Sequence, residues 1–596
     1  MPSLSNIALF CFCFAVTNLT AQNITRGPYL QRPTADGITF RWRTDIPTDS
    51  RVIYAAASDT TKLFTKADNA LTTEHEIVLT GLPRDTRYFY KIGTSQRILN
   101  QSRDQFFTTA PAADTKRPIR FWAMGDFGDQ GEKYATNQRA VRDQFLARKN
   151  GPVDLWVWLG DNAYCCGTEP EYQAQVFDFY GSSIFGSMPI LPSPGNHEYY
   201  ATTSAANHQD RNVPYYDIVT TPTQGESGGV PSGTEAYYAV NYGNVHFVSL
   251  DSYGYDEGKY PFSDPDGPQY KWLDKDLAAN TSLWTIVFFH HPPYTKRSHD
   301  SDGEAELRII REALVPLFDK HKVDLVLNGH SHVYERSYLM KDHTGLSFTF
   351  DKNRHVVQDT KALYTKDSAP IINKDQGTVY MTIGSAGRLD WNGRNETLPA
   401  AVYANVEIGG SSIFTIQDNR LDSEWICADG QIRDRFTMFK NVNKRTEKRI
   451  DLGQSVELTA SWPGTHRWST GQVNTRTITV QPQSDMVVTV RDSLGYLVDE
   501  FPIFVKIPPG LATAPGAEDF IIYPNPGSDL VIIENPGRRN VDVTVTVTDL
   551  TGKRVLERPF LFNSKQEVDI RSLPAGTYFV EVKSASQVWR KRIVKR

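Results

Sequence analysis

The sequence has few cysteines, no excess of basic residues and no apolar run long enough to cross a membrane. It holds 5 cysteines in 596 residues, and only Cys165, Cys166 and Cys427 lie beyond the first 21 residues. Three thiols cannot all pair internally, which excludes a small scaffold held together by disulfides. A bond between Cys165 and Cys166, or between either of them and Cys427, is compatible with the sequence.

Charge and composition exclude further classes. The formal net charge is -5, so the chain lacks the basic balance of a nucleic-acid-binding protein, and we expect no nucleic-acid-binding surface. Hydrophobic residues make up 39% and charged residues 22%, an ordinary balance for a globular protein. A chain of 596 residues is too long for one hydrophobic core, which predicts three or four domains.

The first 21 residues predict export. Ile7 to Val16 is a short apolar run, followed by polar residues and then Ala21. This pattern is typical of a signal peptide, here residues 1–21, that is removed after export. The run is too short to span a bilayer, and no later segment predicts a transmembrane segment.

Four regions follow the predicted signal peptide. Residues 24–112 alternate apolar and polar positions, with strands predicted at 38–43, 51–54, 76–79 and 88–92. This favours a small antiparallel sandwich. Residues 450–507 and 518–596 also contain short strand patterns separated by turns, with a turn at 468–471 and a linker at 511–518, and predict two further β-domains.

The second region, residues 117–440, has a different period. Strands are predicted at 121–124, 155–159 and 323–327, and helices at 135–148 and 304–321. Pro316 inside the second helix should kink or restart it. Alternating strands and helices predict a layered α/β domain, so the fold class is multidomain, α/β plus all-β.

Five short motifs occur in order within the α/β region. They are Asp126-Phe127-Gly128, Gly160-Asp161-Asn162-Ala163-Tyr164, Gly195-Asn196-His197-Glu198, Val287-Phe288-Phe289-His290 and Gly329-His330-Ser331-His332. Each is weak alone, but together they supply carboxylates, an amide oxygen, imidazoles and a phenol, which suit iron, zinc or manganese. Three of the motifs follow predicted strands, and ligands converge at the carboxyl ends of strands in open α/β sheets. The glycines before Asp161, Asn196 and His330 would permit tight turns there.

The five motifs resemble those of the calcineurin-like metallophosphoesterases. Tyr164, three residues after Asp161, resembles the purple acid phosphatase type, and Arg26 to Gln31 resembles the opening of that family's fibronectin type III-like domain. The resemblance covers residues 24 to about 440. It implies a four-layer α/β/β/α catalytic core behind a fibronectin-like sandwich.

The resemblance also implies a pair of metal ions. Fe(III) would be held by Asp126, Tyr164 and His332, a divalent Zn, Mn or Fe by Asn196, His290 and His330, and Asp161 would bridge them. We choose His290 rather than His291 because Val-x-x-His followed by x-Pro fits the family motif, which leaves His291 beside the ligands or facing the substrate.

The implied reaction is hydrolysis of a phosphate monoester by metal-bound hydroxide. His197 is not a family ligand but adjoins one, so we expect it to protonate the leaving alkoxide. His299, nine residues after His290, resembles a substrate-contacting histidine of the plant enzymes. Two alternatives stay open: a phosphodiesterase or nucleotidase on the same metals, and a surface-binding protein without catalysis. The substrate, the divalent metal, the pH optimum and the oligomeric state are not encoded in these motifs.

The C-terminal region carries a resemblance of its own. Tyr523 to Pro526, Val547 to Lys553 and Leu573 to Phe579 resemble a type IX secretion sorting domain, and residues 450–507 resemble an immunoglobulin-like spacer. The implied partners are the secretion machinery and a small phosphorylated substrate. The implied location is the medium or the cell surface, reached through the periplasm.

Overall fold

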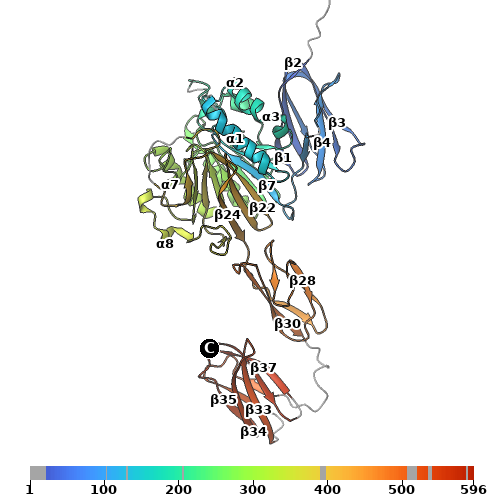
Figure 1. The fold of residues 1–596 in the computed structure, drawn as a ribbon, viewed down its shortest axis with the longest axis vertical. Helices are drawn as coiled ribbons and strands as arrows, with labels where there is room; N and C mark the ends of the chain where they lie inside the picture. The colour runs from blue at the N-terminus through green and yellow to red at the C-terminus, as the bar shows by residue number, and fades with distance from the viewer. Residues whose placement is uncertain are drawn as a thin grey trace, which may run out of the picture. The chain divides into compact units, whose positions relative to one another are not determined.

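A computed structural model describes residues 22–596 except 103, 129–131, 205–206, 208, 390–396, 507–519, 535–539 and 586–587 (Figure 1). The predicted signal peptide and the predicted linker at 511–518 lie outside the described residues. The chain divides into two compact units. The first comprises residues up to 446 with 457–479 and 487–502, and the second comprises 447–456, 480–486 and 503–596.

The N-terminal region is a set of six antiparallel strands: β1 (Ile24–Thr34), β2 (Gly37–Ala56), β3 (Phe64–Leu79), β4 (Arg87–Gly93), β5 (Ile98–Asn100) and β6 (Phe106–Thr108). The two strands predicted at 38–43 and 51–54 are one long strand, β2. It pairs with β1 and β3 along its first part and with β3 and β4 along its second. A register shift in the β2–β3 pair falls between these parts, where a bulge lets one strand serve two sets of partners.

This region is attached to the α/β region by specific contacts. Tyr29 of β1 packs on Phe177 with ring centroids 4.9 Å apart, and its hydroxyl donates to the carbonyl of Ile218 at 2.8 Å. The hydroxyl of Tyr90 likewise donates to the carbonyl of Gly186 at 2.9 Å. Because a buried tyrosine hydroxyl needs a partner, these bonds fix where the rings sit.

The α/β region contains two seven-stranded sheets. The first has the order β19 (Ile371–Asn373), β24 (Ile432–Lys440), β23 (Arg420–Cys427), β22 (Gly410–Gln417), β7 (Ile119–Met124), β8 (Leu155–Leu159) and β9 (Ile190–Ser193). The second has the order β10 (Tyr238–Tyr242), β11 (Val245–Ser249), β14 (Trp284–Phe288), β15 (Leu325–Asn328), β20 (Val379–Ile383), β16 (Tyr334–Ser337) and β21 (Ala401–Asn405). In the described residues of this region, two further pairs of antiparallel strands lie outside the sheets: the hairpin β12 (Tyr255–Asp256) with β13 (Tyr260–Pro261), and β17 (Leu339–Met340) with β18 (Val356–Gln358).

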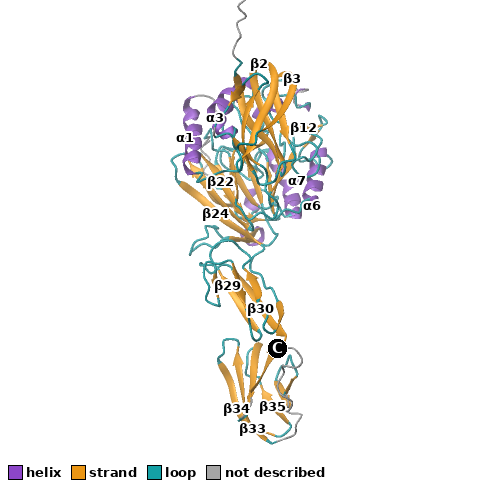
Figure 2. Ribbon diagram, turned by 90° about the vertical axis from the view of Figure 1, so that its right-hand side faces the viewer, coloured by secondary structure: helices purple, strands orange, loops and turns teal. Residues whose placement is uncertain are grey.

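Helices flank these sheets. They are α1 (Glu132–Arg148), α2 (Glu169–Glu171), the π-helix η1 (Tyr172–Phe177), α3 (Asp178–Phe185), the 3₁₀ turns η2 (His197–Tyr199) and η3 (Ser347–Thr349), α5 (Pro214–Ile218), α6 (Pro268–Ala279), α7 (Ala305–His321) and α8 (Lys352–His355). Figure 2 shows α1 and α3 on one side of the strands and α6 and α7 on the other. The expected restart at Pro316 is wrong, because α7 runs through it as one helix. Its neighbours Leu314, Val315, Leu317 and Phe318 are buried, and this packing offsets the one backbone bond that proline removes.

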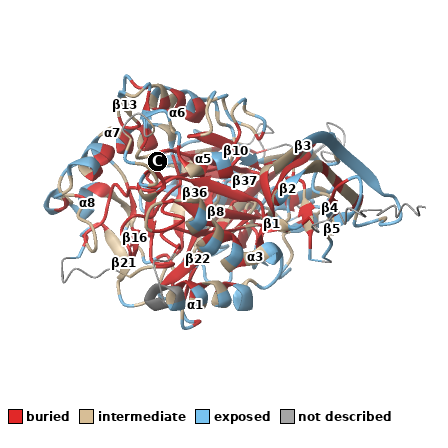
Figure 3. Cartoon of the chain, turned by 90° about the horizontal axis from the view of Figure 1, so that it is seen from above, coloured by how far each residue is buried: buried red, intermediate tan, exposed pale blue. Residues whose placement is uncertain are grey.

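The central strands are apolar on both faces. In β8, Leu155, Val157 and Leu159 enter the cluster shared by the two sheets, whereas Trp156 and Trp158 enter the cluster with α1 and α3. Successive side chains of a strand point to opposite faces, so a strand covered on both sides must be apolar throughout. Figure 3 shows these strands largely buried, with exposed residues on α1 and α7.

The remaining described elements are β-strands. Between 448 and 506 lie β25 (Lys448–Asp451), β26 (Val456–Thr459), β27 (Arg467–Trp468), β28 (Thr477–Val480), β29 (Met486–Arg491) and β30 (Val498–Lys506). Beyond 520, a sheet of β31 (Ile521–Tyr523), β32 (Leu530–Glu534) and β35 (Lys565–Asp569) accompanies a second of β34 (Arg554–Phe562), β33 (Val541–Asp549), β36 (Gly576–Lys583) and β37 (Val588–Lys595). None of the helices in the described residues combines the length and apolarity needed to cross a membrane.

Candidate metal centre

The seven candidate metal ligands lie just beyond the carboxyl ends of five strands. Asp126 follows β7, Asp161 and Tyr164 follow β8, Asn196 follows β9, His290 follows β14, and His330 and His332 follow β15. β7, β8 and β9 are parallel neighbours in one sheet, and β14 and β15 are parallel neighbours in the other. Their carboxyl ends therefore open on one place, where α/β proteins commonly bind ligands.

One half of the site gathers around the phenol of Tyr164. Its hydroxyl lies 3.0 Å from Asp126 Oδ1, 3.1 Å from Asp161 Oδ2 and 3.2 Å from His332 Nε2. Burial and the two carboxylates raise the pKa of Tyr164 well above its usual range. The phenol would ionise here only if a cation offset the negative charge of Asp126 and Asp161.

The other half contains three buried ligand atoms that make no hydrogen bond, although His290 Nε2 lies 3.1 Å from Asp161 Oδ2 and His330 Nε2 lies 4.0 Å from Glu304 Oε2. Within the described residues, Asn196 Oδ1, His290 Nε2 and His330 Nε2 are buried and make no hydrogen bond. The second polar side-chain atom of Asn196 and of His290 has a hydrogen-bond partner. Asn196 Nδ2 donates to the Tyr200 hydroxyl at 3.1 Å, and His290 Nδ1 lies 2.8 Å from the Leu159 carbonyl. Unsatisfied buried polar atoms are costly, so each calls for an explanation. Oxygen and imidazole nitrogen are the donors that a divalent cation takes.

Charge around His290 favours a cation in the same place. One ligand atom each from Asp161, His290 and His330 lies within 4.8 Å of the others. Burial lowers the pKa of His290, but the carboxylates of Asp161 and Asp126 outweigh it and raise the pKa to about 9. The carboxylates thus stabilise positive charge at this position, and the residues present fit a pair of metal ions.

The backbone at the site is strained. Asp126, Asp161 and His330 have φ of 55°, 50° and 66°, a left-handed conformation that non-glycine residues seldom adopt. Of the three glycines expected to form tight turns, only Gly160 has positive φ, at 86°. Gly195 and Gly329 lack positive φ but provide space beside the carboxylates. A Cβ on Gly195 would lie 2.2 Å from Asp161 Oδ1, and one on Gly329 would lie 2.5 Å from Asp126 Oδ2.

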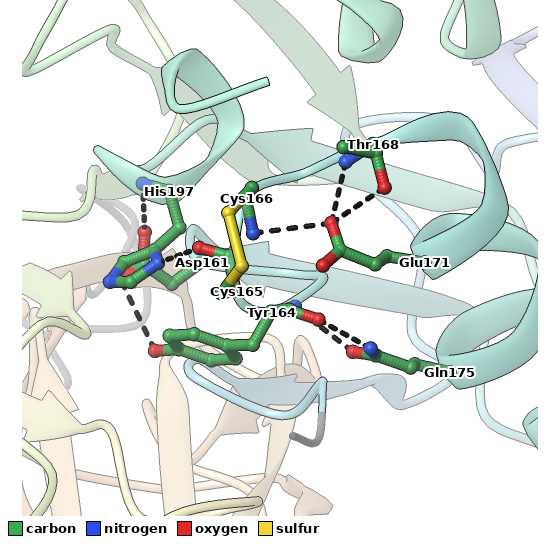
Figure 4. The surroundings of a disulfide bond; sticks show 8 residues. All are labelled: Asp161, Tyr164, Cys165, Cys166, Thr168, Glu171, Gln175 and His197. Atoms are coloured by element: carbon green, nitrogen blue, oxygen red, sulfur yellow. Dashed lines mark hydrogen bonds and ion pairs between the residues drawn. A yellow bond between two sulfur atoms is a disulfide. The ribbon is translucent and has the colours of Figure 1, made fainter. Parts of the chain in front are cut away.

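The loop after β8 contains a disulfide between the adjacent Cys165 and Cys166 (Figure 4). Cys427 is a buried free thiol. Gln175 holds the backbone of Tyr164, accepting from its N–H at 3.0 Å and donating to its carbonyl. Glu171 accepts from the N–H of Cys166 at 3.2 Å. The loop is therefore anchored on both sides of the disulfide, which fixes the direction of the Tyr164 ring.

The three histidines proposed for catalysis also lie here. His197 is partly buried, its Nδ1 contacts the carbonyl of Cys165, and its Nε2 lies 3.7 Å from Asp161 Oδ2. His291 is buried, with its ring centroid 4.3 Å from that of His330 and its Nδ1 2.8 Å from Ser252 Oγ. His299 stacks near His330 at 3.9 Å and pairs with Glu304 at 2.8 Å.

The sequence analysis did not predict a role for Glu198. Glu198 is fully buried, and its carboxylate accepts from the N–H groups of Asp161, Asn162 and Gly195 at 3.0, 2.8 and 2.6 Å, and from the Tyr172 hydroxyl at 2.9 Å. It thereby joins the loop after β8 to the loop after β9. Its place beside Asn196 and His197 was the available signal, but the motif does not reveal whether a carboxylate faces a metal or backbone amides.

Three families match the chain. Residues 28–109 match the purple acid phosphatase N-terminal domain, residues 119–334 the calcineurin-like phosphoesterase family, and residues 521–596 the secretion system C-terminal sorting domain. This last match indicates secretion or a cell-surface location. It also implies an interaction with secretion machinery.

Individual proteins agree with these matches. The chain is 28% identical to a purple acid phosphatase of Glycine max over 351 residues, 57% of this chain and 66% of that protein. It is 26% identical to the Fe(3+)-Zn(2+) purple acid phosphatase 12 of Arabidopsis thaliana over 319 residues, 52% of this chain and 59% of that protein. The match covers less than two thirds of each of these two relatives. The structure of a purple acid phosphatase from yellow lupin (Lupinus luteus) seeds aligns with a TM-score of 0.53 at 18% identity, covering 69% of this chain and 74% of that one, which shows a common fold.

Proposed function

For a chain that carries a calcineurin-like phosphoesterase domain behind a purple acid phosphatase N-terminal domain and ahead of a sorting domain, we propose hydrolysis of phosphate monoesters at a two-metal centre. The observation that carries the proposal is the close approach of ligand atoms from Asp161, His290 and His330, within 4.8 Å of one another. Asn196 Oδ1 is likewise buried and makes no hydrogen bond, and His290 Nε2 lies 3.1 Å from Asp161 Oδ2. Buried polar atoms that make no hydrogen bond call for an explanation, and a bound metal ion supplies one.

The donor chemistry divides the site into two unequal halves. Asp126, Tyr164 and His332 would hold Fe(III), because an anionic phenolate and a carboxylate suit a hard trivalent ion. Asn196, His290 and His330 would hold the divalent ion, with Asp161 between the two. The name of the Arabidopsis thaliana relative, Fe(3+)-Zn(2+), supports zinc as the divalent metal. When bound, such a pair activates water and stabilises negative charge on the phosphoryl oxygens.

The chain's own residues then handle the leaving group and the phosphate. His197 directs Nδ1 to the carbonyl of Cys165, so in the protonated ring Nε2–H is the hydrogen available for the leaving oxygen. His299, ion-paired with Glu304, and His291 flank His330 and would donate to phosphate oxygens. Glu198 keeps Asp161 and Gly195 in place through three backbone bonds, although it touches no reacting atom.

Location follows from the two ends of the chain. We propose that residues 1–21 direct export and that the sorting domain then directs passage to the cell surface or the medium. The substrate would thus be a phosphate ester present outside the cell.

The testing experiment combines metal analysis with substrate comparison. Purified protein should contain two metal ions per chain and hydrolyse monoesters faster than diesters. A ferric phenolate absorbs visible light, so Tyr164→Phe should remove the colour while the fold survives. Tyr242→Phe, which loses a buried hydroxyl 3.3 Å from Asp154 and outside the site, is the matched control. Metal-loaded wild type that hydrolyses no monoester would refute the function, and iron-loaded wild type without a visible band would refute the role of Tyr164.

A further inference from the structure

A cavity of about 490 Å³ opens beside the candidate metal centre. Its walls come from the turn after β9, the loop after β11, hairpin β12–β13 and the start of α7. The residues that line it include Tyr200, Tyr253, Tyr255, His291, Glu306 and Ile309. A concave apolar site with a few polar groups is the usual form of a small-molecule pocket.

Two of the lining residues connect the cavity to the candidate ligands. His291 faces the cavity, and its ring centroid lies 4.3 Å from that of His330 and 5.0 Å from that of His290. Tyr200 also lines the cavity, and its hydroxyl accepts a hydrogen bond from Asn196 Nδ2 at 3.1 Å. A phosphate ester bound at the metal centre therefore has this cavity next to it for the rest of the molecule.

The side chains that line the cavity are largely aromatic, and several of them are partly exposed to solvent. Tyr253 lies parallel to His291 with ring centroids 6.0 Å apart and touches the ring of Tyr200 edge-on at 6.1 Å. Tyr200, Tyr255 and Ile309 remain 43%, 46% and 49% exposed. Single exposed apolar residues are ordinary, but three from separate segments around one cavity form a surface suited to an apolar ligand.

The charge of the wall is one-sided. No lysine or arginine is among the described residues that line the cavity, and Glu306 is its acidic group. Glu306 makes no ion pair within the described part of the chain. Burial and the neighbouring Tyr200, Tyr255 and Glu306 raise the pKa of Tyr253 to about 12, as expected where these groups face a common space. Such a wall attracts an uncharged ring and repels an anion.

We propose that this cavity binds the alcohol part of the ester, and that it selects phosphate monoesters of uncharged aromatic alcohols over esters of small aliphatic or anionic alcohols. The inference rests on the proposed function, because the phosphate held at the metal centre places the alcohol in the cavity. Tyr255 and Ile309 are specificity-determining residues for the ring, and Glu306 is specificity-determining against negative charge.

The test compares kcat/KM for benzyl phosphate, ethyl phosphate and 3-phosphoglycerate with the metal-loaded full chain. Benzyl and ethyl phosphate both release an alkyl alcohol, so a difference between them reports binding of the ring. We expect benzyl phosphate to be preferred over ethyl phosphate by about 10-fold or more, with 3-phosphoglycerate slowest. The double variant Tyr255→Ala with Ile309→Ala should bring the benzyl-to-ethyl ratio close to one. Phe348→Ala removes a residue that is 81% exposed and outside the cavity, and should leave the ratio unchanged.

A second variant tests the charge. Glu306→Gln should raise kcat/KM for 3-phosphoglycerate several-fold and leave ethyl phosphate unchanged, whereas Glu312→Gln on the same helix should change neither. Inhibition by inorganic phosphate, which has no alcohol part, should be the same in every variant and verifies that the metal centre is intact. Hydrolysis of these esters with a wild-type ratio near one, or a ratio that the double variant does not move, overturns this inference alone. No hydrolysis of any monoester by the metal-loaded wild type overturns the proposed function and the inference with it.

Discussion

The phosphoesterase region and the C-terminal sorting domain bury different kinds of side chain. In the phosphoesterase region Asp126, Asp161, Glu198 and His290 are at most 1% exposed. In the described residues from 520 to 596 the core is built from apolar residues such as Val531, Val545 and Val580, and no polar or charged residue is buried. The ion pairs of that domain, including Arg571–Asp569 and Arg590–Glu581, lie on its surface.

The presence or absence of buried charged groups indicates where in each region the functional residues lie. A buried charge costs several kcal/mol unless it is paired, so a fold keeps one only where something compensates for it. The described residues of the sorting domain include no such group, and we expect its recognition to depend on surface residues. The phosphoesterase region gathers several of them around one point, as a metal site requires.

Asp161→Asn should remove both metal ions and lower kcat by at least about 10³-fold. The carboxylate would neutralise two cations, whereas an amide brings no charge. Metal content and turnover of the purified variant are the measurements. Asp143→Asn, on the exposed side of α1, is the matched control and should behave as wild type. A variant at 161 that retains both metals and near-normal turnover would show that the site is wrongly assigned.

His197→Ala should keep both metals but reduce turnover by about 10²–10⁴-fold, the range for a general acid. The loss should be smaller for a nitrophenyl ester, whose leaving group needs no proton. His321→Ala, which removes a histidine paired with Asp274 at 2.6 Å outside the site, controls for loss of an imidazole. An equal loss on all esters would exclude the acid role and leave His197 as a residue that shapes the loop.

Glu335→Gln tests the cost of a buried carboxyl that the site does not use. Burial raises the pKa of Glu335 to about 7 from its usual 4.5. The folded state therefore holds this proton more tightly than the unfolded state, and the free energy of unfolding falls as pH rises from about 4.5 to 7. The variant should escape this loss and be more stable than wild type by about 3 kcal/mol above pH 7, since one pKa unit corresponds to about 1.4 kcal/mol.

Thermal unfolding of both proteins from pH 4.5 to 8 checks this prediction. The gap between them should open across that window. Glu424→Gln, an exposed position on β23, should show no such gap. A constant difference between wild type and Glu335→Gln at every pH would contradict the raised pKa.

Deletion of residues 521–596 should have the smallest effect on catalysis. The tail has its own apolar core, so the remaining chain should stay folded with unchanged kcat/KM. Its effect should be on location: the truncated enzyme should remain in the periplasm. Fractionation of cells with an activity assay measures both, and truncated protein that still reaches the medium or cell surface would contradict the role of the tail.

Much of this organisation was predictable from the sequence. The runs at 121–124 and 155–159 were recognisable as buried strands because their faces are apolar on both sides, and Asp126 and Asp161 follow them directly. The motif order then predicted which ligand types would meet. The helix at 304–321 was predicted by its period, but its continuity through Pro316 depends on packing that a local pattern does not contain.

Residue types and periodicity in the sequence were enough to identify the carboxylates, imidazoles, amide and phenol of the five motifs. They were also enough to predict the strands that carry these groups and the family they resemble. The three-dimensional structure was needed to see which of their atoms make no hydrogen bond, that Gly195 and Gly329 make room for carboxylates, and that Cys165 bonds to Cys166. It also decided that Glu198 binds three backbone amides and that Tyr200, Tyr255 and Ile309 surround one cavity. The physical reason is that burial, close approach and hydrogen-bond geometry arise between segments far apart in the chain, whereas residue type and period are local.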